Sequence, residues 1–190
     1  SHLSSADEDN SLDPKSSTQK QKFKFQELLK QIKVDRNHKI KIHLANSAGM
    51  LLNKDFHFHM VRVGLSMYGY SPLAKIDKNL SLKPALFLKV KVAFIRVIDQ
   101  GVRVSYGGKF VSSRKTKLAV LSIGYADGVP RNLSGKIKVI HNNKLYPQVG
   151  SITMDQMMVD ITDSNEIKVG STMVLLGSDG DKTISPLDWA

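Results

Sequence analysis

The pattern of hydrophobic positions changes part-way along the chain. In residues 19–32, apolar side chains recur at near-helical spacing with lysines between them, which predicts an amphipathic helix with a buried apolar stripe. Residues 39–43 alternate like a short strand, and a second strand is predicted near residues 60–63. Strands alternating with helices are typical of a β/α barrel, so we expect residues 1–72 to be a portion of one, its last strands.

The hydrophobic period becomes two after a predicted linker at residues 73–84, which holds Lys, Asp, Asn and Ser between prolines. Strand-like runs follow at residues 86–95, 117–123, 136–140, 157–161 and 172–176. In residues 86–95, apolar positions alternate with a set that includes two lysines, so we expect the lysine-bearing face to be wet and the other face to be inward: Leu86, Leu88, Val90, Val92 and Phe94. An all-β domain with one wet face on each strand is therefore predicted for residues 85–190. Ser185 before Pro186 predicts a helix start, and we expect the domain to be truncated inside that turn.

The composition is that of ordinary globular protein, with 41% hydrophobic and 24% charged residues. It contains no apolar run long enough to cross a membrane, so no membrane partner is expected. The chain has no cysteine, which excludes disulfides and thiolate metal sites and is compatible with a cytoplasmic protein.

A net charge of +11 raises the question of nucleic-acid binding. Residues 1–72 hold eleven Lys or Arg and seven Asp or Glu, and residues 73–190 hold seventeen and ten. The excess is therefore spread along the chain, and lysines such as Lys89 and Lys91 alternate with apolar residues. This arrangement indicates the wet face of strands, and we expect no nucleic-acid partner.

Two tyrosines next to glycines are the first candidates for chemistry. Tyr106 lies in the run VSYGG and Tyr125 in IGYADGVPR, each at the end of an apolar stretch. Glycine lets the backbone turn tightly or lie close to a ligand. A tyrosine titrates at about pH 10 and is a base only where its surroundings favour phenolate. From residue types alone, two tyrosines that close a hydrophobic core are the simpler interpretation.

Further blocks lie in a fixed order around these tyrosines: SHLSSAD at 1–7, HLANSAG at 43–49, VRVGLSMYGY at 61–70 and VGSITMDQ at 149–156. Together they resemble the alanine racemase family of fold-type III enzymes that use pyridoxal 5′-phosphate (PLP), over nearly the whole chain. The resemblance implies an α/β barrel of the TIM type followed by the β domain. It also implies interconversion of L- and D-alanine, which supplies D-alanine for peptidoglycan in the cytoplasm.

The resemblance assigns roles to individual residues. PLP would be bound by His43, Ser47, Arg62, Gly64 and Leu65, with the Arg62 side chain on the pyridine nitrogen and the others at the ring or phosphate. The catalytic residues would be Tyr106, His2 and Arg62, because a hydrogen-bond chain through His2 to the fixed cation Arg62 favours the phenolate. Without the resemblance, Arg62 could instead reach solvent, and both histidines could be ordinary surface or core residues.

Racemisation needs a proton removed from one face of the α-carbon and one delivered to the other. The resemblance makes Tyr106 one base and a lysine that carries PLP the other. This lysine lies in a half of the family that should precede Ser1, so the 190 residues alone are expected to be inactive. The Met154 N–H would bind the substrate carboxylate, and Tyr125 and Arg131 would line the entrance. In the implied homodimer, Tyr106, Tyr125 and Met154 act on the barrel of the second subunit.

Three positions depart from the family pattern: Ser151 replaces the usual arginine, which should alter the entrance lining, Val63 a proline, and Leu65 an isoleucine. His57 and His59 could share a metal, but no third ligand is evident, so no metal is expected. Other candidates are a broad-specificity, lysine, arginine or serine racemase, a non-catalytic PLP-binding barrel protein, and a basic binding module. The β domain with Tyr106 argues against the barrel protein, and the dispersed charge argues against the binding module.

Overall fold

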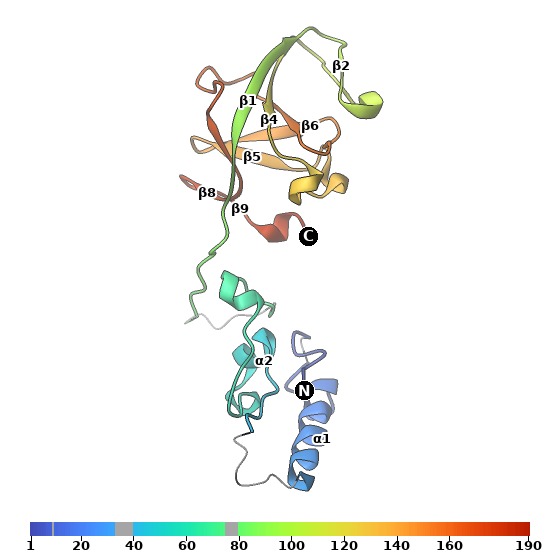
Figure 1. Ribbon diagram of the computed structural model, residues 1–190, viewed down its shortest axis with the longest axis vertical. Coiled ribbons are helices and arrows are strands. Elements are labelled where there is room, and N and C mark those ends of the chain that lie inside the picture. The colour runs from blue at the N-terminus through green and yellow to red at the C-terminus, as the bar shows by residue number, and fades with distance from the viewer. Residues whose placement is uncertain (9, 33–39, 75–79) are drawn as a thin grey trace. The chain divides into compact units, whose positions relative to one another are not determined.

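The computed structural model describes residues 1–8, 10–32, 40–74 and 80–190. It divides the chain into two compact units, Ser1–Ala85 and Leu86–Ala190 (Figure 1). The predicted linker at residues 73–84 falls at the end of the first unit, and its residues 75–79 lie outside the described part. Within the described ranges, no helix has the length and hydropathy that crossing a membrane would need.

Helices α1 (Ser17–Gln31) and α2 (Ser47–Leu52) are the main elements of the first unit, with the 3₁₀ turns η1 (Lys54–Phe56) and η2 (Leu65–Tyr68). The predicted helix is confirmed: α1 starts where the Ser16 hydroxyl accepts a hydrogen bond from the Gln19 N–H at 3.2 Å. The two predicted strands shrink to a single parallel bridge between His43 and Met60. Parallel pairing of neighbouring strand ends is the arrangement of a β/α barrel.

The core of the first unit consists of six fully buried residues: Leu3, Ala6, Leu44, Ala45, Ala48 and Phe56. The expectation that the apolar stripe of α1 is buried is wrong for most of its length. Phe23 is 66% exposed, and Leu28 and Ile32 are about half exposed. Of the apolar residues in this stripe, Phe25 packs onto the core, with its ring edge-to-face against Phe58 at 5.4 Å. Within the described residues, no other element covers the Phe23 side of this helix.

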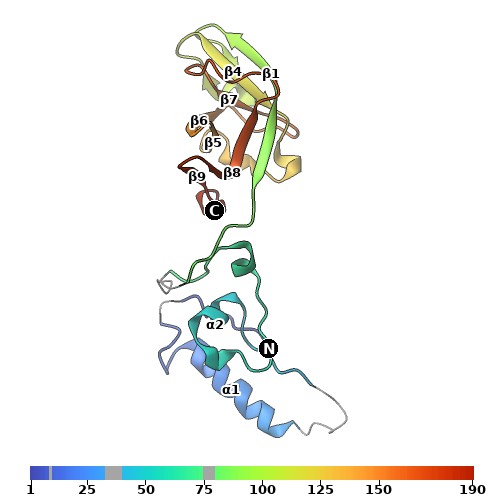
Figure 2. The ribbon, with the colours of Figure 1, turned by 90° about the vertical axis from the view of Figure 1, so that its left-hand side faces the viewer.

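The second unit is an antiparallel β structure, as predicted. Its strands are β1 (Leu88–Ile98), β2 (Arg103–Val104), β3 (Phe110–Val111), β4 (Thr116–Leu121), β5 (Lys138–His141), β6 (Lys144–Val149), β7 (Met157–Asp160), β8 (Thr172–Asp179) and β9 (Lys182–Ile184). The large sheet has the order β1-β4-β7-β6-β5-β8-β9, and β8 also pairs with β1 (Figure 2). This pairing closes β1, β4, β7, β6, β5 and β8 into a ring, while β9 pairs with β8 alone and remains an edge strand.

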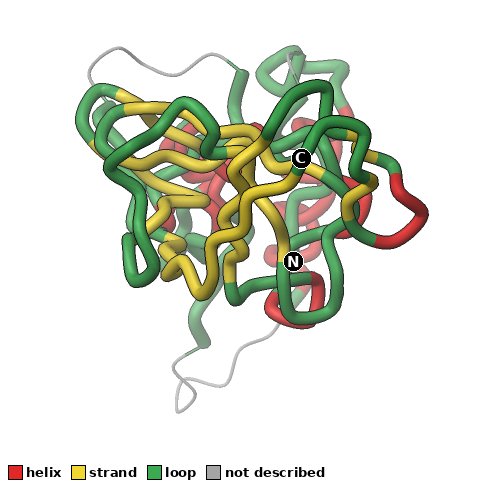
Figure 3. The backbone as a smooth tube through the Cα atoms, turned by 90° about the horizontal axis from the view of Figure 1, so that it is seen from above, coloured by secondary structure: helices red, strands yellow, loops and turns green. Residues whose placement is uncertain are grey.

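The loops of the second unit contain short helical turns (Figure 3). These turns are η3 (Tyr106–Gly108), η4 (Tyr125–Asp127), η5 (Arg131–Leu133) and η6 (Pro186–Asp188). The predicted helix start at Ser185 is confirmed, since its hydroxyl accepts from the Leu187 N–H at 3.1 Å. The sequence did not predict β6, β9 or the β2–β3 pair.

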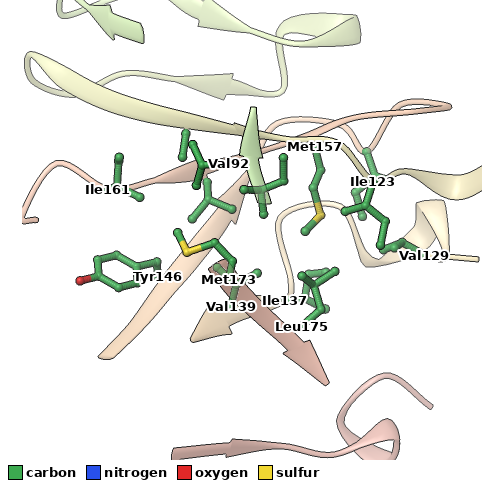
Figure 4. Close-up of a cluster of buried hydrophobic side chains, with 14 of the residues drawn as sticks. Val92, Ile123, Val129, Ile137, Val139, Tyr146, Met157, Ile161, Met173 and Leu175 are labelled. Atoms are coloured by element: carbon green, nitrogen blue, oxygen red, sulfur yellow. The ribbon is translucent and has the colours of Figure 1, made fainter. Parts of the chain in front are cut away.

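Side chains from six strands converge in the core of the second unit, where Val92, Met157, Met173 and Leu175 are fully buried (Figure 4). In β1, alternation holds through Val92 as predicted, but Phe94 is 57% exposed instead of buried. The register shifts between Val92 and Phe94, and Ile95 takes the inward position. A β-bulge adds one residue and reverses the alternation beyond it, which explains the wrong prediction for Phe94.

Candidate functional site

One pocket of about 460 Å³ in the first unit contains most of the residues for which the resemblance implies a cofactor role. It is lined by His2, Leu3, Ser4, Asp7, Asn46, Ser47, Ala48, Arg62, Gly64, Leu65 and Pro72. His43 does not line this pocket, but it forms the β-bridge with Met60, two residues before Arg62. The pocket residues Asn46, Ser47, Arg62 and Gly64 follow the two bridged residues, His43 and Met60, in the sequence. They therefore lie at the carboxyl ends of the predicted strands, where β/α barrels have their active sites.

Arg62 is held firmly at this pocket. Its Nη1 lies 2.9 Å from Nδ1 of His2, and its Nη2 donates to the carbonyls of Ser1 and, at 3.2 Å, Leu44. Because a guanidinium only donates, a neutral His2 accepts at Nδ1 and carries its proton at Nε2. The Asn46 Nδ2 group, 3.5 Å from Nε2, is itself a donor and is therefore a neighbour and not a hydrogen-bond partner of this proton. The predicted contact between His2 and Arg62 is therefore present.

Two buried nitrogen atoms at this place have no hydrogen-bond partner among the described residues: Nε of Arg62 and Nδ1 of His43. Buried polar groups in proteins are nearly always hydrogen-bonded, so each is a group that a bound molecule can satisfy. Burial lowers the pKa of the His43 imidazole, and the positive charge of Arg62 lowers this pKa further. His43 is therefore expected to be neutral at pH 7.

Ser47 organises the loop that precedes η2. Its hydroxyl oxygen accepts from the N–H of Gly64 at 2.8 Å and from that of Ser66 at 3.3 Å, and the N–H of Leu65 between them is left out of this bonding. A Cβ placed on Gly64 would meet only Ser47 Oγ, at 3.9 Å. Packing of the described chain thus does not require glycine at position 64.

A second pocket, of about 480 Å³, lies in the second unit. It is lined by Tyr106, Tyr125, Arg131, Ile152, Thr153, Met154 and Asp155. These residues come from three loops that are far apart in the sequence, and they include all three residues to which a substrate role was given. Tyr106 is 71% exposed, so its phenol is accessible to a ligand.

Close backbone contact joins two of these loops. Gly124 has no room for a side chain, because a Cβ there would lie 2.2 Å from the carbonyl oxygen of Thr153. The N–H of Tyr125 donates to that carbonyl at 3.0 Å, and the N–H of Ala126 donates to the carbonyl of Met154 at 3.0 Å. These bonds use the Met154 carbonyl and not its N–H. The guanidinium of Arg131 lies 6.0 Å from the centre of the Tyr125 ring, at the limit of a cation–π contact.

The third loop is attached through two serines. The Ser151 hydroxyl donates to the carbonyl of Tyr106 at 2.8 Å, and the Ser105 hydroxyl donates to the carbonyl of Ser151 at 2.8 Å. Ser151 is only 4% exposed and does not line the pocket. The Ser151 side chain therefore adds nothing to this lining, and the effect of a serine in place of the family's arginine on the entrance stays a prediction.

The two histidines that the sequence weighed as metal ligands bond to the backbone instead. Nε2 of His57 lies 2.9 Å from the carbonyl of Met50, and Nδ1 of His59 accepts from the N–H of Ile42 at 3.3 Å. Across the described ranges, no group of three or more His, Asp or Glu side chains is arranged to hold a metal ion.

Asn46 lines the first pocket and Ser105 holds one loop of the second through its bond to Ser151, but neither was singled out from the sequence. The Asn46 side chain accepts from the Gly49 N–H at 3.0 Å and so caps α2, and it also donates to the carbonyl of Leu3 at 3.3 Å. An asparagine directly before a predicted helix start is the signal that could have identified it. No comparable sequence signal marks Ser105.

Comparison with known proteins decides which family these pockets belong to. The family "Alanine racemase, N-terminal domain" matches residues 1–72, and "Alanine racemase, C-terminal domain" matches residues 85–190. The chain belongs to the alanine racemase family. The alanine racemase of Prochlorococcus marinus is 51% identical over 190 residues, which are 100% of this chain and 49% of that protein. The alanine racemase of Synechocystis is 43% identical over 191 residues, 100% of this chain and 50% of that protein.

Solved alanine racemase structures have the same fold. The alanine racemase from E.faecalis aligns with a TM-score of 0.84 at 31% identity, over 99% of this chain and 48% of that one. The enzyme from Bacillus anthracis with bound L-Ala-P aligns with a TM-score of 0.84 at 36% identity, over 100% and 48%. That from Bartonella henselae with covalently bound pyridoxal phosphate aligns with a TM-score of 0.77 at 36% identity, over 93% and 46%. The chain thus spans about half the length of the racemases that it matches.

Proposed function

We propose that this chain contributes the second acid–base residue and much of the cofactor pocket of a PLP-dependent alanine racemase, which interconverts L- and D-alanine. The observation that carries the proposal is the convergence of Tyr106, Tyr125, Arg131 and Met154 on one pocket. A PLP-binding barrel without racemase activity would have no use for this second pocket. Membership of the alanine racemase family supports the same assignment.

The residues present in the first pocket fit PLP. The Arg62 Nε is a buried donor that lacks an acceptor within the described chain, as the pyridine nitrogen would provide. An arginine keeps its proton, so it would leave that nitrogen uncharged. His43 would support the ring, and the phosphate would be bound by the Ser47 hydroxyl and the unused Leu65 N–H. Gly64, whose own N–H donates to Ser47 Oγ at 2.8 Å, would let the phosphate approach the backbone closely. When bound, PLP supplies the electron sink that makes the α-proton of an amino acid acidic.

The chain's own acid–base group is the phenol of Tyr106. It would take the proton from one face of the α-carbon of L-alanine and return a proton to that face in the reverse direction. His2, whose Nδ1 lies 2.9 Å from Nη1 of Arg62, would donate a hydrogen bond from Nε2 that stabilises the phenolate. The Met154 N–H, which the loop's own hydrogen bonds leave unused, would hold the substrate carboxylate. Tyr125 and Arg131 would line its entrance.

The whole protein is proposed to act as a homodimer in the cytoplasm, where it supplies D-alanine for peptidoglycan. Tyr106, Tyr125 and Met154 of one subunit would then serve the PLP pocket of the other, so that each active site needs both subunits. We use "parent protein" for the complete polypeptide in which these 190 residues occur.

The direct test is to incubate the purified parent protein with PLP and each pure enantiomer of alanine, and to follow optical rotation. We expect both reactions to approach the same 1:1 mixture, since the two enantiomers have equal free energy. The same assay with lysine, arginine and serine separates alanine racemase from its relatives. Preference for one of these amino acids over alanine would contradict the assignment, as would the absence of any racemisation.

A further inference from the structure

The peptide that carries Tyr106 is held by a reciprocal pair of hydrogen bonds, which we call the Ser105–Ser151 pair. The hydroxyl of Ser151 donates to the carbonyl of Tyr106, and the hydroxyl of Ser105 donates to the carbonyl of Ser151, each at 2.8 Å. Ser105 is half-buried and Ser151 almost completely buried, whereas Tyr106 is largely exposed. The loop is therefore anchored through its backbone and leaves the phenol free to meet a ligand.

Ser105 adopts a backbone conformation that side chains normally avoid. Its φ of 64° with ψ of −178° lies in a region occupied almost only by glycine. Such a residue stays in this conformation only where its surroundings hold it there, and residues of this kind gather at functional sites. Here the strained residue directly precedes Tyr106, so its conformation decides the direction in which the tyrosine leaves the β domain.

Gly150 permits the close contact that makes the pair possible. Its φ is 71°, and a Cβ at this position would lie 2.9 Å from Cβ of Ser105 and 3.2 Å from the carbonyl oxygen of Val104. Glycine thus lets the loop that ends β6 lie directly against the Tyr106 loop. The hydroxyl of Ser151, the next residue, is then within hydrogen-bond distance of the Tyr106 carbonyl.

We propose that Ser151 is a positioning residue for Tyr106, and that the Ser105–Ser151 pair holds the strained peptide that aims the phenol at the substrate. This inference rests on the proposed function, in which Tyr106 exchanges a proton with the amino acid. At the position where the family usually has arginine, this chain has a small, buried side chain that bonds to the backbone of the acid–base residue itself. The role is specific to a hydroxyl, because no apolar side chain of similar size can donate to the Tyr106 carbonyl.

Ser164 offers a matched control. It is also 4% exposed and lies in the loop after β7, where its hydroxyl oxygen accepts from the Ile167 N–H at 3.4 Å. Ser151→Ala and Ser164→Ala thus each remove one buried hydroxyl from the same unit. Only the first removes a hydrogen bond to the peptide of Tyr106.

The first test measures amide hydrogen exchange of residues 104–109 in the parent protein without substrate, so that its result is independent of activity. We expect Ser151→Ala to raise exchange in this peptide roughly three- to tenfold, the factor supplied by one neutral hydrogen bond. Ser164→Ala should leave this peptide unchanged, and Ser151→Thr, which keeps a hydroxyl, should restore slow exchange. Unchanged exchange in Ser151→Ala, or the same rise in Ser164→Ala, would overturn the proposal.

A second test uses the strain at Ser105. Ser105→Ala and Ser105→Gly both remove the hydroxyl, but only glycine adopts a φ of 64° freely. The glycine variant should therefore unfold at the higher urea concentration, although glycine is the less stable of the two at ordinary positions. An alanine variant as stable as the glycine variant, or more stable, would show that Ser105 is not strained and would overturn the account of the pair.

Kinetics connect the pair to the reaction. We expect Ser151→Ala to lower kcat roughly three- to tenfold with KM changed less than about twofold, since Met154 and Arg131 are untouched. An unchanged kcat would contradict the positioning role. If the parent protein racemised no amino acid, the proposed function would fail, whereas the exchange of residues 104–109 would still decide whether the pair holds the loop.

Discussion

His2 and Arg62 lie sixty positions apart in the sequence, yet Nδ1 of His2 is 2.9 Å from Nη1 of Arg62. The contact fixes the tautomer of the histidine, because the guanidinium can only donate. Arg62 also lines the neighbouring pocket, and its Nε is buried and without a partner among the described residues. One arginine can therefore orient a histidine with one nitrogen and bind a cofactor with another.

Replacing Arg62 by lysine tests this double role, because lysine keeps the charge but loses the planar fork and the Nε donor. We expect the affinity of the parent protein for PLP to fall roughly 10- to 100-fold, the range for a lost hydrogen bond to a charged group. Titration of dialysed protein with PLP, followed by absorbance, measures it. Arg114→Lys is the control, because Arg114 bonds to Asp163 at an exposed ion pair. Equal affinities of the two variants would refute the cofactor role of Arg62.

Gly124→Ala should destabilise the second unit. The added Cβ would lie 2.2 Å from the carbonyl oxygen of Thr153, which belongs to rigid backbone, so the loops of Tyr125 and Met154 must separate. We expect a loss of about 1–3 kcal/mol in the free energy of unfolding, as for overpacking elsewhere. Urea denaturation measures this quantity. A variant as stable as the wild type would show that the two loops are not in the described contact.

Gly64→Ala is expected to leave the stability of the fold unchanged but to weaken the binding of PLP. Its Cβ would meet only Ser47 Oγ at 3.9 Å, so the free energy of unfolding should change by less than about 0.5 kcal/mol. The same methyl group would obstruct a phosphate that approaches the backbone at this position. We therefore expect the affinity for PLP to fall roughly 5- to 100-fold, as judged by titration. A stable variant with unchanged PLP affinity would remove Gly64 from the proposed phosphate site.

The stability of the first unit should depend on the protonation of His43. Burial and the charge of Arg62 lower the pKa of this imidazole in the folded chain below its ordinary value of 6.5. The unfolded chain therefore binds the proton more readily, so folding stability is constant above the unfolded pKa and falls as the pH drops through about 6.5. Urea unfolding at pH 7.5 and 5.5 measures the loss. His43→Asn should reduce it, and an equal loss in the variant would assign the pH dependence to other groups.

The sequence was sufficient where local spacing decides the structure and insufficient where pairing decides it. Helix α1 follows from its repeat, and Val90 and Val92 face the core as their alternation predicts. Phe94 does not, because β1 pairs with β8 up to Lys91 and with β4 from Val92 onward, and the bulge occurs near this change of partner. No property of residues 86–95 alone specifies which strand will lie beside each half.

The candidate site shows the same limit. The order of motifs was enough to name Tyr106, Arg62 and Met154, and the structure gathers them into two pockets, one in each unit. The motifs in the sequence marked Ser151 only as a departure from the family pattern. That its side chain turns inward to the carbonyl of Tyr106 depends on Gly150 and on the strained backbone of Ser105, which only the folded chain reveals.

The central claim is that Tyr106 serves one face of the substrate, and the parent protein carrying Tyr106→Phe tests it most directly. Because each turnover needs both bases, racemisation should slow about 10²–10⁴-fold in both directions. Exchange of the α-proton with deuterated solvent should then distinguish the enantiomers. We predict that L-alanine, which faces Tyr106, stops exchanging, while D-alanine, which faces the PLP lysine implied by the family, keeps exchanging at a measurable rate. Equal loss of exchange for the two enantiomers would contradict the account and leave Tyr106 a packing role.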